Sequence, residues 1–97
     1  YVLLDEPLNY IDMHHAVGIM QLLRRAADEK GKTVVVVLHD INFASCYSDQ
    51  IIAMRAGQVA YQGTPEQIIR GEVLSDIYQL PMQVHELAGQ RICVYFR

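Results

Sequence analysis

The chain has 97 residues and a mass of 11.0 kDa, enough for one small domain. Its 8 basic and 11 acidic residues give a net charge of −3 without any run of Lys or Arg, which excludes a protein that coats nucleic acid. A hydrophobic content of 52% excludes a disordered chain. The longest apolar runs, 34–38 and 92–96, are far shorter than the ~20 residues of a membrane-spanning helix.

The first residues predict a strand and a long helix. The run from Tyr1 to Leu4 is apolar and short, and Pro7 follows it closely, which favours a buried strand over a helix. After a loop over 8–11, Asp12 is a good N-cap for a helix whose apolar residues recur every three or four positions as far as Gly31. Because the chain opens inside a strand with Tyr1 instead of Met, we expect it to be a piece of a longer protein.

The run 33–38 is β-branched and continuous, which predicts a second strand buried on both faces, as in parallel sheets. Asp40 is expected to cap a short helix that ends near Tyr47. The remaining chain predicts a hairpin over 51–61, a short helix opened by a capping box at Thr64, another over 72–80, and a terminal hairpin over 82–96. Cys46 and Cys93 show no metal-binding spacing; buried thiols are expected, with a disulfide between them as the alternative.

Strand, helix and strand in this order form a βαβ unit, in which parallel strands bring their carboxyl ends to the same edge of the sheet. Asp5-Glu6 follows the first strand and His39-Asp40 the second, so two acids and a histidine are predicted to meet there. A carboxylate can hold Mg²⁺, a second can deprotonate water, and a histidine can contact a phosphate. The combination favours metal-assisted phosphoryl transfer.

Each of these residues also has a plain structural interpretation. Asp5-Glu6 could only end a strand with solvated charge, Asp12 could only cap its helix, and His39 could be a structural residue. The other histidines, His14, His15 and His85, are interpreted as surface or structural residues.

The segment 1–7, Tyr-Val-Leu-Leu-Asp-Glu-Pro, resembles the Walker B motif of ATP-binding cassette (ABC) ATPases. The segment 8–12 resembles the D-loop that follows it, although Ile11 stands where the family usually has Leu, and 37–40 resembles the switch-histidine segment. These motifs share the family's order and spacing. The segments 39–49 and 63–69 resemble the branch that imports iron–siderophore complexes.

The resemblance implies an α/β fold, a partial P-loop NTPase (RecA-like) core with parallel strands and a C-terminal extension of short helices and a β-hairpin. Residues 1–97 would be the C-terminal portion of the nucleotide-binding domain. By resemblance, Glu6 and His39 are catalytic, as general base and γ-phosphate contact. Asp5 would bind Mg²⁺, and Asp12 would reach the ATP site of a second subunit. The implied cofactors are ATP and Mg²⁺.

The implied partners are a second ATPase subunit, a transmembrane permease and, indirectly, a periplasmic or lipoprotein substrate-binding protein, with no nucleic acid. The location would be peripheral, on the cytoplasmic face of the membrane. The sequence has no Gly-x-x-x-x-Gly-Lys-Ser/Thr phosphate loop and no Ser-Gly-Gly-Gln signature, so we expect the 97 residues alone to be inactive. Three alternatives remain open: the head of a DNA-repair-type cassette ATPase, a non-catalytic dimerising fragment, and a Mg²⁺-dependent phosphotransfer domain of another α/β family.

Overall fold

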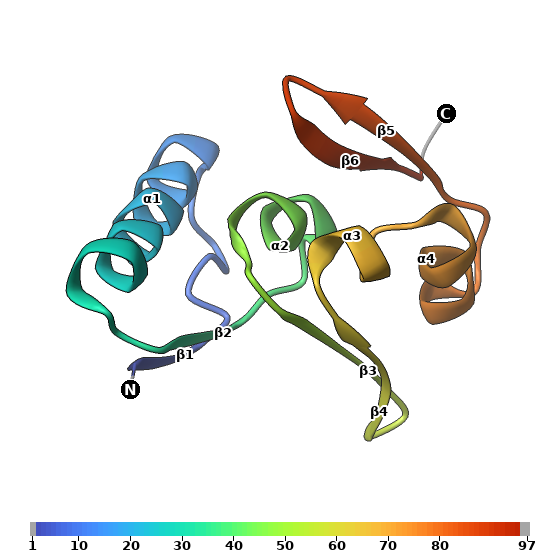
Figure 1. The fold of residues 1–97 in the computed structure, drawn as a ribbon, viewed down its shortest axis with the longest axis horizontal. Helices are drawn as coiled ribbons and strands as arrows, with labels where there is room; N and C mark the ends of the chain where they lie inside the picture. The colour runs from blue at the N-terminus through green and yellow to red at the C-terminus, as the bar shows by residue number, and fades with distance from the viewer. Residues whose placement is uncertain (1, 96–97) are drawn as a thin grey trace. The chain divides into compact units, whose positions relative to one another are not determined.

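The computed structural model describes residues 2–95, which form two compact units divided after Phe43. The elements in chain order are β1 (Val2–Asp5), α1 (Met13–Lys30), β2 (Val34–Val37), α2 (Ile41–Tyr47), β3 (Ile51–Arg55), β4 (Gln58–Gly63), α3 (Pro65–Ile68), α4 (Gly71–Tyr78), β5 (Gln83–Leu87) and β6 (Gln90–Val94) (Figure 1). The predicted order of strands and helices is confirmed. Tyr1 and Phe96, which the predictions place in strands, lie outside the described residues.

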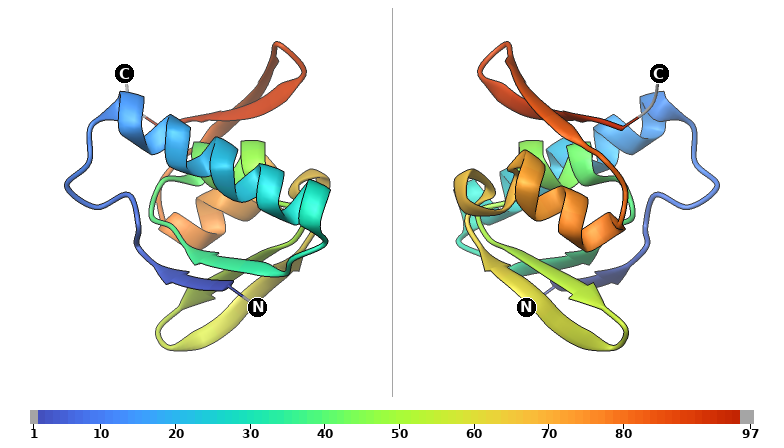
Figure 2. Two further views of the ribbon diagram at one scale, coloured as in Figure 1. Left: turned by 90° about the vertical axis from the view of Figure 1, so that its left-hand side faces the viewer. Right: turned by 90° about the vertical axis from the view of Figure 1, so that its right-hand side faces the viewer.

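In the first unit, β1 and β2 pair in parallel from Val2 opposite Val34 to Asp5 opposite Val37. The helix α1 lies on one side of this pair (Figure 2). The predicted parallel strands are therefore confirmed.

The prediction that the second strand is buried on both faces is wrong for the described chain. Exposure alternates along both strands, and one face of the pair remains open, with Leu3 73% exposed and Val35 47% exposed. Successive side chains of a strand point to opposite faces, so in a pair covered on one side only every second residue is shielded, and those residues are half-buried here. The apolar character of the open face explains why the sequence suggested burial on both sides.

Local chemistry defines both ends of α1. The Asp12 carboxylate accepts a hydrogen bond of 2.9 Å from the His15 backbone N–H, which confirms the predicted N-cap. Gly31 ends the helix with a φ of 61°, a left-handed conformation that glycine adopts without steric cost. Ala16 and Met20, one helical turn apart, are the buried residues of this helix.

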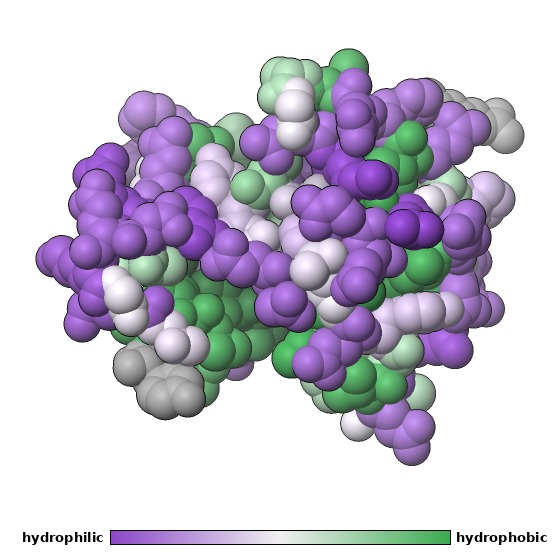
Figure 3. Space-filling view, viewed as in Figure 1, coloured by the Kyte–Doolittle hydropathy of each residue, from purple (hydrophilic) through white to green (hydrophobic). Residues whose placement is uncertain are grey.

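The second unit contains two antiparallel hairpins, β3–β4 and β5–β6. In each, Ala-Gly forms the turn with positive φ at both residues, 54° and 76° at Ala56-Gly57 and 52° and 76° at Ala88-Gly89. This is the type I′ geometry whose twist suits a two-residue hairpin. Apolar side chains gather on the surface of β3 and β4 (Figure 3), where Ile52 is 57% exposed.

The short helices α3 and α4, with the residue that follows α3, contribute three buried apolar side chains to the core of this unit. The side-chain oxygen of Gln67 accepts a hydrogen bond of 3.0 Å from the Thr64 backbone N–H, one half of the predicted capping box. Ile68, Ile69 and Leu74 are almost fully buried. So is the thiol of Cys93, whose pKa is raised by burial; Cys46 is half-buried, and no disulfide joins the two. No helix within residues 2–95 is long and apolar enough to cross a membrane.

Candidate functional site

The ends of β1 and β2 bring Glu6 and His39 into contact. The Glu6 backbone N–H donates a 3.0 Å hydrogen bond to the Val37 carbonyl and so continues the pairing of the two strands by one residue. Just beyond this point, the Oε1 atom of Glu6 contacts the Nε2 atom of His39. Of the two acids and the histidine predicted to meet at the carboxyl edge, the structure brings Glu6 and His39 into contact.

The backbone of Glu6 turns its side chain out of the strand alternation. Its φ is 52°, in the left-handed region that residues other than glycine rarely adopt. Such a conformation costs of order 1 kcal/mol and persists where the surroundings hold it. Here the hydrogen bond to Val37 and a 3.3 Å bond from the Asn9 N–H to the Glu6 carbonyl hold it.

Glu6 and His39 line a hollow of about 220 Å³ that lies entirely in the first unit. Its apolar wall includes Met13 and Ala16 of α1 and Phe43 of α2. The side chains of Glu6 and His39 are 33% and 74% exposed, so the pair is open to solvent and can be reached by a ligand. Asn9 is one of its polar groups and lies in the predicted loop, for which the sequence pattern indicates no role of this side chain.

Asp5 and Asp12, the other two predicted site residues, do not line this hollow. Asp5 is exposed at the end of β1, where strand alternation puts it on the open face with Leu3. The Asp12 carboxylate is engaged within its own helix, 2.9 and 3.0 Å from the Nδ1 atom of His15. The hydrogen bond from the His15 backbone, followed by that from the His15 side chain, lowers the pKa of Asp12 below its ordinary value. The structure therefore brings together two of the four predicted residues.

No group of three or more His, Cys, Asp or Glu side chains within residues 2–95 is arranged to hold a metal ion. The exposed carboxylate of Asp5 suits a cation that needs few protein ligands. Mg²⁺ is such a cation, since it is usually bound by one or two carboxylates together with water and substrate phosphates. The donor chemistry at the end of β1 therefore fits the Mg²⁺ that the sequence predicts.

The segment Gly31-Lys32-Thr33 matches the last three residues of the phosphate-loop motif, but it does not precede a helix as that motif does. A phosphate loop joins a strand to the N-terminus of a helix, where backbone N–H groups point at the phosphate. Here Gly31 ends α1 and the segment leads into β2. The C-terminus of a helix carries a partial negative charge, so this segment does not form a phosphate cradle.

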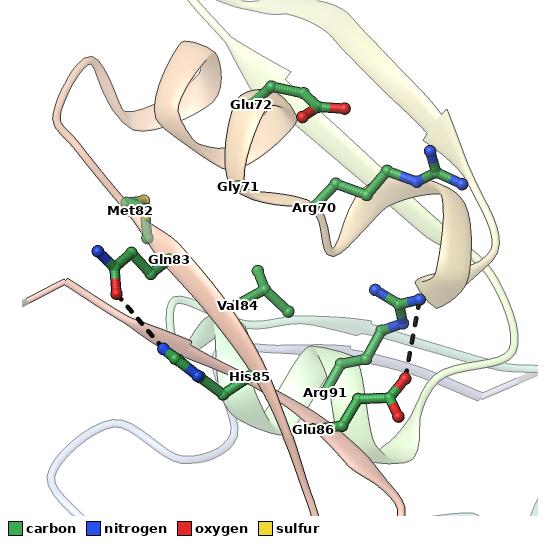
Figure 4. Close-up of a pocket in the computed structure, with 9 residues that line it drawn as sticks. All are labelled: Arg70, Gly71, Glu72, Met82, Gln83, Val84, His85, Glu86 and Arg91. Carbon is green, nitrogen blue, oxygen red and sulfur yellow. Dashed lines mark hydrogen bonds and ion pairs between the residues drawn. The ribbon is translucent and has the colours of Figure 1, made fainter.

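A second, more open hollow of about 760 Å³ lies between the start of α4 and the β5–β6 hairpin (Figure 4). Its two arginines have partners in the protein. Arg91 donates to the Ile69 carbonyl at 3.1 Å and lies 3.9 Å from Glu86, and Arg70 donates to the Glu66 carbonyl. The bond from Arg91 to Ile69 joins the hairpin to the end of α3, so this arginine has a structural role.

No family model matches the chain. Its α/β fold matches part of solved ABC transporter structures. An inward-facing metal-chelate type ABC transporter superposes with a TM-score of 0.81 at 23% identity, over 97% of this chain and 38% of that one. The protein cbiO1 from Clostridium perfringens, part of the ABC transporter complex cbiONQ, has a TM-score of 0.64 at 31% identity, over 76% of this chain and 30% of that one.

Relatives in sequence indicate which kind of ABC transporter protein the chain resembles. The petrobactin import ATP-binding protein YclP of Bacillus subtilis is 51% identical over 99% of this chain, and FatE of Bacillus anthracis is 47% identical over 98%. The ferric enterobactin transport ATP-binding protein FepC of Escherichia coli is 40% identical over 81%. The chain is thus homologous, over nearly its whole length, to ATP-binding proteins of ABC importers for siderophores and hemin. It spans 38% of the length of the first two relatives. The resemblance seen in the motifs is confirmed.

Proposed function

We propose that this chain is the C-terminal portion of a P-loop ATPase domain that powers the import of an iron–siderophore complex. The observation that carries the proposal is the contact of Glu6 with His39 at the carboxyl ends of two parallel strands. Relatives named for petrobactin and enterobactin support the substrate class. The alternative of a DNA-repair-type ATPase or a dimerising fragment is not favoured, because the homologues are import proteins.

In the proposed mechanism, Glu6 orients the attacking water and accepts its proton as the water oxygen attacks the γ-phosphorus. The bond from that phosphorus to the ADP oxygen breaks, and the products are ADP and phosphate. His39, beside Glu6, contacts the γ-phosphate and thereby senses whether it is bound. The left-handed backbone of Glu6 supports this role, since it points the carboxylate at His39 instead of along the sheet.

Asp5 would hold Mg²⁺, which when bound neutralises phosphate charge. Asp12 would reach a second ATPase subunit, and its carboxylate would have to serve that contact as well as its N-cap. The phosphate loop and signature would come from sequence that the longer relatives possess. The partners would be a second copy, a transmembrane permease and, indirectly, a periplasmic or lipoprotein substrate-binding protein. The assembly would place the domain at the cytoplasmic face of the membrane.

A chimera tests the proposal. This chain would replace the matching 96 residues of YclP, and growth of a YclP-deficient Bacillus subtilis strain on petrobactin iron would be measured together with ATP turnover. We expect the chimera to restore both, and His39→Ala to abolish both. His85→Ala, a histidine of the terminal hairpin, is the matched control and should have no effect. A chimera that folds but hydrolyses no ATP, or that is indifferent to His39→Ala, would contradict the proposal.

A further inference from the structure

The Glu6 carboxylate is held from two directions. Its Oε1 atom contacts His39, and its Oε2 atom accepts a 3.2 Å hydrogen bond from the side-chain Nδ2 of Asn9. These are the side-chain hydrogen bonds of Glu6 within residues 2–95. An ionised carboxylate only accepts hydrogen bonds, so the NH₂ group of the Asn9 amide must face it.

Asn9 also fixes the backbone of the same residue. Its N–H donates to the Glu6 carbonyl at 3.3 Å and closes the turn that follows β1. Glu6 is therefore held at both its main chain and its carboxylate by one residue, in a left-handed conformation that needs such support. A contact with His39 alone would leave the carboxylate able to rotate about its last bond, whereas two partners on two oxygens define its plane.

We propose that Asn9 is the positioning residue of Glu6, the group that sets which carboxylate oxygen meets His39 and which way the carboxylate faces the attacking water. The inference rests on the proposed function, since it assigns the residue that holds the general base. Asn9 would act through Glu6, with which its side chain and its backbone both form hydrogen bonds. A small displacement of a catalytic group lowers the rate of the chemical step more than it weakens substrate binding, so loss of Asn9 should lower kcat and leave KM nearly unchanged.

Two substitutions at this position separate positioning from simple packing. Asn9→Ala removes the donor. Asn9→Asp keeps the shape but replaces the donor with a second negative acceptor that repels the Glu6 carboxylate. In the YclP chimera, we expect kcat for ATP to fall about tenfold in Asn9→Ala and about a hundredfold in Asn9→Asp, with KM unchanged within about twofold. A residue with only a packing role would show the opposite order, because the Asp side chain is the closer match in shape.

The controls distinguish failure of this inference from failure of the proposed function. Gln21→Glu makes the same amide-to-acid change at an exposed position of α1 and should leave kcat unchanged. Thermal unfolding of each variant shows whether it is folded. Suppose that the wild-type and Gln21→Glu chimeras hydrolyse ATP and that a folded Asn9→Asp chimera has the same kcat. Asn9 then has no positioning role, although the ATPase assignment stands. If the folded wild-type chimera hydrolyses no ATP, the proposed function and this inference both fall.

Discussion

Replacing Gly63 by alanine should destabilise the second unit through one identifiable side chain. Gly63 is the buried last residue of β4, and a Cβ atom built on it would overlap the Oε1 atom of Gln67 and lie 3.2 Å from the Gln67 Cβ. The same Oε1 atom accepts the hydrogen bond from the Thr64 N–H that closes the start of α3. The Gln67 side chain must therefore move away, and the cap is lost. Loss of a helix cap costs about 1 kcal/mol, and displacing the side chain adds to it.

Gly18 provides the matched control for this change. It lies exposed in α1, and a Cβ atom at this position would meet nothing within 4 Å. Gly18→Ala should raise the stability by about 0.5–1 kcal/mol, because alanine restricts the unfolded chain and favours helix. Urea unfolding followed by far-UV circular dichroism measures both changes. Gln67→Ala removes the Oε1 atom and leaves only the closer approach to the Cβ atom of residue 67, so Gly63→Ala should cost less in that background. An equal cost in both backgrounds would refute the reasoning.

Three further changes test the described contacts. Asp12→Asn should destabilise the chain at neutral pH. Because folding lowers the pKa of Asp12, its carboxylate contributes to stability above the unfolded pKa near 3.8, and this contribution is lost as the pH falls below it. The difference in unfolding free energy between the two proteins should therefore vanish in acid. Ala88→Asn should stabilise by about 0.5 kcal/mol in thermal unfolding, because asparagine tolerates the positive φ of this type I′ turn better than alanine. Leu74→Ala removes a side chain of 0% exposure and should cost about 2–5 kcal/mol in urea unfolding, and an unchanged midpoint would contradict its place in the core.

The elements could be predicted because short signals define them. Asp12 and Gly31 mark the two ends of α1, and Ala-Gly pairs mark both hairpin turns. The meeting of Glu6 with His39 could also be predicted, since parallel strands align their carboxyl ends.

Other features depend on conformations that spacing does not reveal. The contact of Asn9 with Glu6 arises only because the backbone takes a left-handed turn at Glu6, which no local signal marks in a charged residue. The exposure of Leu3 and Val35 depends on what covers the strands, and an apolar run does not say whether one face or both are covered. Features set by local chemistry, such as caps and turns, could be predicted from the sequence. Features that depend on which elements pack over a strand, or on a rare positive φ, could not.

The central claim is that Glu6 activates the water that attacks ATP. The most direct test is Glu6→Gln in the YclP chimera, with ATP binding and single-turnover hydrolysis measured separately and with Glu29→Gln, an exposed glutamate of α1, as control. We expect Glu6→Gln to bind ATP as tightly as the wild type and to hydrolyse it about 10²–10⁴-fold more slowly, the range for loss of a general base. Hydrolysis by Glu6→Gln at the rate of the Glu29→Gln control would contradict it.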